Sequence, residues 1–258
     1  MVILTKRRKF ILSSSLLSLG LLSIQMGLLP NRYLAIVILS LLTIPLFLWS
    51  LKDAVKGPIW FLSWMLPLLF TSGVGFFYFL LPNSFYTTIP VIIFYFLGMY
   101  ALFLTENIFS VAAIRTIQLY RSSSAVNFLM TLLISFLLYD TILSFRLPFY
   151  YTSALVFIIS FFFFLHNFWT VNLNEKISLK ILIYSIIFSL GVGQTAIAIS
   201  FWPVTISMGS IFLTSIVYVA LGISQAKLND RLFPKTIREY LLVGILVFII
   251  LIIYTSWG

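Results

Sequence analysis

The sequence predicts an all-α protein, a polytopic helical membrane protein with about nine transmembrane helices. Three observations indicate this class: 62% of the 258 residues are hydrophobic, only 9% are charged, and the apolar residues occur in continuous runs. A soluble domain is about half apolar and about a quarter charged, so this chain cannot cover a water-facing surface. The apolar runs do not alternate as in membrane β-strands. The composition therefore excludes a soluble domain and, with no cysteine, a disulfide-stapled one.

Nine stretches are long enough to cross a bilayer, whose core of about 30 Å requires roughly 20 apolar residues in a helix. The predicted spans are 10–29, 33–51, 58–81, 89–109, 125–143, 151–169, 180–200, 204–224 and 240–257. The first follows a basic run and lacks a small-residue cleavage site, which favours an uncleaved anchor. Cleavage would leave eight spans. Because the connections are short, we expect one transmembrane domain over 1–258.

The basic residues predict the orientation of these spans. With the N-terminus in the cytoplasm, the cytoplasmic side holds Lys6, Arg7, Arg8, Lys9, Lys52, Lys56, Arg115, Arg121, Lys176, Lys180, Lys227, Arg231, Lys235 and Arg238. Arg32 and Arg146 face outward, as does the C-terminus. This bias, together with attraction to anionic lipid headgroups, explains the net charge of +10. The basic residues are spread over several loops, which excludes a nucleic-acid-binding face.

Two longer connections, 110–124 and 225–239, are predicted to form amphipathic helices at the inner interface. In the second, Lys227, Arg231 and Lys235 recur at steps of four, and Pro234 is expected to break the helix. Their basic faces could recognise anionic headgroups. The alternative is that they only control topology.

Short motifs recur at a spacing of 118 residues and predict an internal duplication. The matched motifs are Leu29-Pro30 with Leu147-Pro148, and Gly73-Val74-Gly75 with Gly191-Val192-Gly193. They pair spans two to five with spans six to nine. A unit of four helices returns to its starting side, so the halves 30–143 and 148–257 would be parallel copies, an arrangement found in transporters. The alternative is chance similarity in a chain of biased composition.

The Gly-Val-Gly motifs predict close helix packing, because glycine lets two membrane helices approach each other. In the seventh span, Ser185, Ser189 and Gly193 recur at every fourth residue and form a small-residue ridge. A broken helix that forms a binding site is the alternative, and the amide of Gln194 near mid-membrane supports it.

The stock of catalytic side chains is small. The chain has six acidic residues, one histidine and no cysteine, which excludes a three-histidine or thiolate zinc site. It also has no phosphate-binding GxxxxGK[ST] motif, so ATP-driven transport by this chain alone is not expected. We predict no cofactor, no metal and no catalytic residue, and an enzyme is the less favoured interpretation.

Ionisable and amide side chains near the inner ends of the spans are the first binding candidates, because such residues are expensive in a membrane. Glu106 and Asn107 end the fourth span, His166 ends the sixth, and Arg115 and Arg121 follow the fourth. They could form one polar patch, in which Glu106 and His166 couple protons and the arginines hold a headgroup or phosphate. The alternative is that all of them reach headgroup water at the interface.

Asp140 is the second binding candidate. It lies late in the fifth span, and Arg146 follows six residues later. A structural Asp140–Arg146 pair at the outer end of the helix is one interpretation. An outward-facing substrate or ion site is the other.

The segments Arg115–Arg121 and Leu138–Ser144, together with Trp169 and Arg238-Glu239-Tyr240-Leu241, carry a resemblance. The chain resembles, over most of its length, an uncharacterised family of multi-spanning membrane proteins from candidate-phylum bacteria, a domain of unknown function. The resemblance implies a bacterial plasma (inner) membrane. It lends no catalytic residues, because that family has no assigned activity.

Three functions fit these observations. The first is non-ATP-driven transport or lipid handling at a site between helices, with membrane lipids as partners. The second is a non-catalytic scaffold or complex subunit, for which an oligomer or a partner subunit is expected. The third is an intramembrane enzyme that acts on a lipid-linked substrate through His166 and Glu106 or Asp140. A water-accessible cavity that reaches these residues would favour transport over the scaffold.

Overall fold

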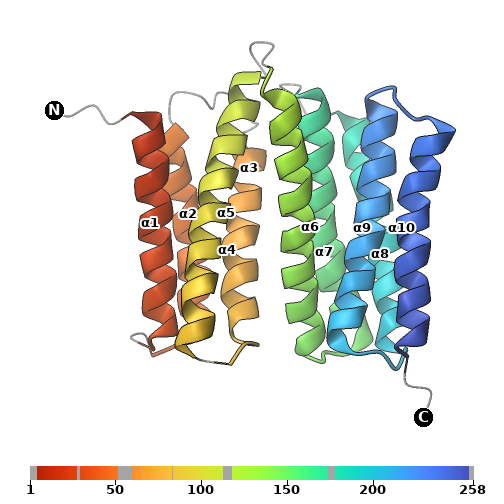
Figure 1. Cartoon of the computed structure of the whole chain (residues 1–258), viewed down its shortest axis with the longest axis horizontal. Helices are drawn as coiled ribbons and strands as arrows, with labels where there is room; N and C mark the ends of the chain where they lie inside the picture. Colours follow the sequence, from red (N-terminus) through yellow and green to blue (C-terminus); the bar gives the residue numbers. More distant parts are fainter. Residues whose placement is uncertain are drawn as a thin grey trace. The chain divides into compact units, whose positions relative to one another are not determined.

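The computed structural model describes residues 5–27, 30–51, 60–82, 84–112, 118–173 and 178–255. All regular structure in these residues is helical (Figure 1). The helices are α1 (Lys6–Gln25), α2 (Arg32–Leu51), α3 (Trp60–Ser63), α4 (Met65–Tyr78), α5 (Phe85–Ala112), α6 (Tyr120–Ser144), α7 (Phe149–Asn172), α8 (Leu179–Ser200), α9 (Ile206–Leu228) and α10 (Pro234–Ile253). The predicted all-α fold class is confirmed.

Eight segments in the described part of the chain are long and apolar enough to cross a membrane. They correspond to eight of the nine predicted spans, and the third span consists of α3 and α4 together. The first predicted span forms α1, a helix of 20 residues, but is not among the eight. Its basic first turn and its serines, which include Ser13 and Ser14, lower the hydropathy of this helix.

The connection 225–239 does not form a separate interfacial helix, so that prediction is wrong. Helix α9 continues to Leu228, and α10 begins at Pro234 after a short turn. Proline is favoured in the first turn of a helix, where its missing N–H needs no partner and its fixed φ matches the helix. Pro234 therefore starts α10 instead of breaking a helix. In the other connection, α5 extends to Ala112 and α6 starts at Tyr120, while 113–117 lie outside the described residues.

The chain divides into two compact units, residues 1–130 and 131–258, and the division falls inside α6. In unit 1, α1 packs against α2 and α5, and α4 packs against α2 and α5. Its core contains an aromatic cluster in which the Phe103 ring centroid lies 6.2 Å from that of Phe10 and 5.7 Å from that of Phe47. Residues from three helices therefore meet at one point of the interior.

In unit 2, α7 packs most extensively against α8, and α9 contacts α7, α8 and α10. Consecutive helices of this unit run in opposite directions (Figure 1). The C-terminal ends of α7 and α9 therefore lie at the same end of the unit as the N-terminal ends of α8 and α10. We call this the basic end, because Lys180, Lys227, Arg231, Lys235 and Arg238 lie there, whereas Arg146 lies at the opposite end.

Both Gly-Val-Gly motifs lie inside continuous helices, as the packing interpretation predicts. A Cβ atom added at Gly75 of α4 would lie 2.8 Å from Ile36 Cγ2 of α2. A Cβ atom added at Gly193 of α8 would lie 3.2 Å from Phe157 Cβ and 3.5 Å from Ser153 Oγ, both in α7. In each unit, the third residue of the motif allows its helix to approach the preceding span.

Candidate functional site

Asn167 joins three helices of unit 2 through side-chain hydrogen bonds. It is fully buried in α7, and its Nδ2 donates to Thr131 Oγ1 of α6 and to the Phe163 carbonyl, both at 2.9 Å. Its Oδ1 accepts from Gln225 Nε2 of α9 at 3.3 Å. A buried amide is costly unless it is hydrogen-bonded, and here both of its polar atoms are bonded within the protein. Asn167 therefore cross-links α6, α7 and α9 and is not a free ligand-binding group.

The residues predicted to form the inner polar patch lie in different environments. Glu106 is fully buried in α5 of unit 1, beside the half-buried Asn107, and Arg121 is exposed in the first turn of α6. His166 is fully buried in α7 of unit 2, and Arg115 lies outside the described residues. The burial of Glu106 and His166 argues against the alternative in which both reach headgroup water. Their coupling stays a prediction.

Asp140 is buried, and its hydrogen-bond partner comes from another helix. Ser210 Oγ of α9 donates to Asp140 Oδ1 at 3.0 Å. Within the described residues, no ion pair joins Asp140 to Arg146. Arg146 is exposed, has a left-handed backbone (φ 49°), and lines a pocket of about 290 Å³ with Thr152 and Trp202. The structural bond at Asp140 is therefore to α9, and not to the nearby arginine.

Gln194 is exposed on α8 and lines a pocket of about 330 Å³ with Tyr150 and Phe157 of α7. Helix α8 is continuous through this position, so the amide lies on a helix surface and not in an unwound segment. The pocket is almost entirely apolar apart from Gln194 and Ser153. The pocket lies beside the contact between α7 and α8.

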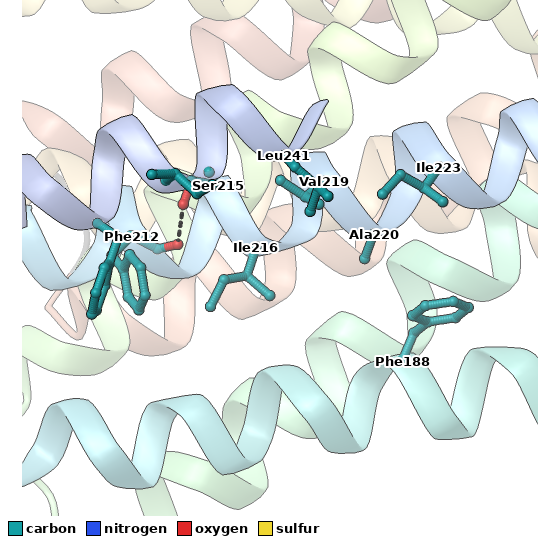
Figure 2. Close-up of a pocket in the computed structure, with 11 residues that line it drawn as sticks. Phe188, Phe212, Ser215, Ile216, Val219, Ala220, Ile223 and Leu241 are labelled. Atoms are coloured by element: carbon teal, nitrogen blue, oxygen red, sulfur yellow. Dashed lines mark hydrogen bonds between the residues drawn. The ribbon is translucent and has the colours of Figure 1, made fainter. Parts of the chain in front are cut away.

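An apolar groove of about 470 Å³ lies between α8, α9 and α10 of unit 2. Figure 2 shows Phe188 of α8 opposite a row of α9 side chains that runs from Phe212 to Ile223. Helix α10 contributes Leu241, Gly244, Ile245 and Phe248. The Ser215 hydroxyl, the one side-chain polar group in the lining, donates to the Phe212 carbonyl at 2.7 Å. We call this pocket the apolar groove.

A second pocket of about 480 Å³ adjoins the groove at the basic end of unit 2. Phe188 lines both pockets, and Ser224 of the second follows Ile223 of the first. The remaining walls of the second pocket are Lys180, Tyr184, Ile187, Lys227, Leu228 and Asp230. We call it the charged pocket. Together, the apolar groove and the charged pocket place an apolar surface next to charged groups, which is the arrangement that an amphiphilic ligand would match.

The sequence reasoning did not identify this pair of pockets. It used Lys180 only to predict the orientation, and it placed Lys227 on a basic face that could recognise anionic headgroups. It did not connect either lysine with a pocket, although Lys180, Tyr184 and Phe188 recur at every fourth residue and so share one face of α8. That spacing indicates a row of side chains along the helix that begins with a charged residue and continues with aromatic ones. The matching face of α9 could not be recognised, because nothing in one sequence indicates which helices pack together.

Among the residues that the structure describes, no three or more His, Cys, Asp or Glu side chains form a group that could hold a metal ion. The fold and the site define a polytopic helical membrane protein with an amphiphilic pocket between three of its helices. The chain belongs to the family described as "Protein of unknown function (DUF5656)", whose model matches residues 14–254. No curated protein and no solved structure matches the chain.

Proposed function

We propose that this chain is a lipid-handling integral membrane protein that holds a lipid acyl chain in the apolar groove. The observation that carries the proposal is the lining of the groove, whose walls are aliphatic and aromatic side chains of α8, α9 and α10. Its volume of about 470 Å³ falls in the range of about 300–1,000 Å³ that is typical of small-molecule sites. An alkyl chain matches such walls, because it leaves no polar atom unpaired.

Lipid handling is favoured over transport of a polar solute. A polar solute needs polar groups that are free to bind it, whereas Asn167 and Asp140 are bonded to residues of neighbouring helices. Of the four pockets described above, none includes Glu106, His166 or Asp140. None of these four pockets is therefore the water-accessible cavity at Glu106, His166 or Asp140 that would favour transport of a polar solute.

The proposal includes a bacterial inner-membrane location, with the basic end of unit 2 in the cytoplasm and the C-terminus outside. The charge asymmetry of the unit supports this orientation, because loops rich in Lys and Arg stay on the cytoplasmic side. The chain has no cysteine, so single cysteines can be placed without background. Arg238→Cys should react with a membrane-impermeant thiol reagent only after cell lysis, and Arg146→Cys in intact cells. The reverse labelling pattern would contradict this orientation and place the basic end outside the cytoplasm.

The parallel repeat is also part of the proposal. It is supported by the two Gly-Val-Gly helices, in which Gly75 faces Ile36 and Gly193 faces Ser153 at nearly the same sequence offset. Trp49 lies near the end of α2 and Trp169 near the end of α7, so they would correspond in the two copies. Their environments differ, since Trp169 is buried and Trp49 is 42% exposed. One glycine contact therefore supports the proposed duplication, and the different burial of the two tryptophans does not.

The experiment that tests lipid handling measures lipid retained by the purified protein. Ala220 lines the groove, whereas Ala198 is exposed on α8 and lines none of the four pockets. We expect the wild type and Ala198→Trp to carry tightly bound lipid in native mass spectrometry after delipidation in detergent. Ala220→Trp should lose most of it, because the indole fills the groove, while its melting temperature stays near that of Ala198→Trp.

Two results would overturn the proposal. One is a wild-type protein that retains no lipid, which would favour the scaffold alternative. The other is equal retention by Ala220→Trp and Ala198→Trp at comparable thermal stability.

A further inference from the structure

We infer that the charged pocket binds the phosphodiester of an anionic phospholipid whose acyl chain occupies the apolar groove. This inference rests on the proposed function and specifies which lipid the site holds. Lys180 and Lys227 come from α8 and α9, so two ammonium groups converge on one pocket from two helices. Phe188 connects this pocket to the groove. A phospholipid is built in the same order, because its charged phosphodiester is followed by an alkyl chain.

The two lysines are available for a ligand. Within the described residues, neither Lys180 nor Lys227 forms an ion pair, although Asp230 lines the same pocket. Lys180 Nζ lies 5.9 Å from the centroid of the Tyr184 ring, on the wall that leads toward Phe188. Lysine is a flexible point charge that suits phosphate oxygens without requiring one fixed geometry.

Ser224 supplies an independent sign that a ligand belongs here. Its side chain is 7% exposed, and its Oγ has no hydrogen-bond partner among the described residues. Other helix serines of unit 2 donate to a carbonyl of the preceding turn, as Ser185 does to Ile181 and Ser200 to Ala196. A buried hydroxyl without a partner is unfavourable. A phosphate or ester oxygen in the charged pocket would accept its hydrogen bond.

The depth of the groove matches one leaflet. Ser224 of the charged pocket and Phe212 at the far end of the groove are 12 residues apart on α9, and 12 steps of 1.5 Å rise span about 18 Å. Half of a bilayer core is about 15 Å. A chain that starts at the charged pocket would therefore run along the groove to about mid-membrane.

The pocket charge indicates the class of headgroup. Two lysines and one aspartate give a net charge of +1 at neutral pH, which complements the single negative charge of a phosphodiester. A dianionic phosphomonoester would place its second charge near Asp230, and a neutral zwitterionic headgroup leaves the net positive charge unbalanced. The N-terminus of α8, next to Lys180, adds a further partial positive charge. The site should therefore prefer phosphatidylglycerol over phosphatidic acid and phosphatidylcholine.

The test uses the full chain in nanodiscs that contain equal amounts of phosphatidylglycerol, phosphatidylcholine and phosphatidic acid, followed by native mass spectrometry of retained lipid. We expect Lys180→Gln combined with Lys227→Gln to lower retained phosphatidylglycerol by on the order of tenfold relative to phosphatidylcholine. The matched control is Lys235→Gln with Arg238→Gln, which removes two exposed charges at the same end, outside the pocket lining. The control should keep the wild-type preference.

Two further variants sharpen the assignment. Ser224→Ala should weaken phosphatidylglycerol retention without changing total charge. Asp230→Asn raises the pocket charge and should shift the preference toward phosphatidic acid.

The outcomes separate this inference from the proposed function. A wild type without bound lipid overturns both. Retained lipid whose headgroup preference is unchanged in the double lysine variant overturns only the headgroup site. Equal loss in the double lysine variant and its control also overturns it, because general attraction of the basic end would then explain the preference. A double lysine variant that loses the preference while Ala220→Trp loses all lipid supports both proposals.

Discussion

Helices α4 and α10 are both apolar, but they occupy opposite environments within their own units. Ten of the 14 residues of α4 are buried, whereas Leu251 is the one buried residue among the 20 of α10. The buried helix contains threonine, serine and two glycines, and the exposed helix is almost purely aliphatic after its first turns. In a membrane, lipid is as apolar as a protein core. Of these two spans, the one with the higher mean hydropathy, 2.4 for Pro234–Ile253 against 1.4 for Phe61–Tyr78, is therefore the one that faces outward. The interior depends on close packing and internal hydrogen bonds.

The largest difference between the two helices should appear on side-chain truncation. Phe70 of α4 is fully buried and its ring centroid lies 5.5 Å from that of Tyr95, whereas Ile249 of α10 is 50% exposed. Phe70→Ala leaves a cavity and should lower the free energy of unfolding by about 3 kcal/mol. Ile249→Ala should change it by less than about 0.5 kcal/mol. Thermal unfolding in detergent measures both, and equal effects would contradict the assignment of interior and exterior.

The second prediction adds atoms instead of removing them. A Cβ atom at Gly75 would lie 2.8 Å from Ile36 Cγ2, and this methyl branches at the Ile36 Cβ, so it cannot move without a rotamer change. Gly75→Ala should therefore destabilise the protein by about 2 kcal/mol. Gly191, in the matching motif of α8, has open space around an added Cβ. Gly191→Ala should be neutral or slightly stabilising in the same thermal assay, because alanine favours the helix. A neutral Gly75→Ala would remove the packing role of the motif.

The sequence was sufficient to predict the helices, because each span needs only a continuous apolar run, and such a run is a local property. The predictions were wrong where the same residue type has two structural roles and the neighbouring structure decides between them. Pro234 can end one helix or start the next, and only the helix that follows it decides between the two. In α1, serines reduce the hydropathy of the helix, although Ser13 of α1 and Ser50 of α2 satisfy each other with a hydrogen bond of 2.8 Å.

The candidate site was less accessible to sequence reasoning, because its contacts are non-local. Arg146 was the obvious partner for Asp140, but Ser210, which is 70 positions away, donates the hydrogen bond. Polar side chains such as Asn167 could be recognised as unusual in a membrane, but their partners could not be identified. The reverse holds for the apolar groove, whose residues are individually ordinary and form a site only because α8 and α10 flank the same face of α9.

The smallest effect should come from the polar pair at the α4–α5 contact. The hydroxyls of Thr71 and Tyr95 lie 2.9 Å apart, and Thr71 also donates to the Pro67 carbonyl at 3.0 Å, so it keeps a partner when the tyrosine hydroxyl is removed. Tyr95→Phe should therefore lower stability by only about 0.6 kcal/mol, the average for such bonds in membrane proteins. Tyr86→Phe, at a position that is 88% exposed, is the matched control and should have no effect on the melting temperature. If Tyr95→Phe were as damaging as Phe70→Ala, the interior of unit 1 would depend on polar pairing more than on packing.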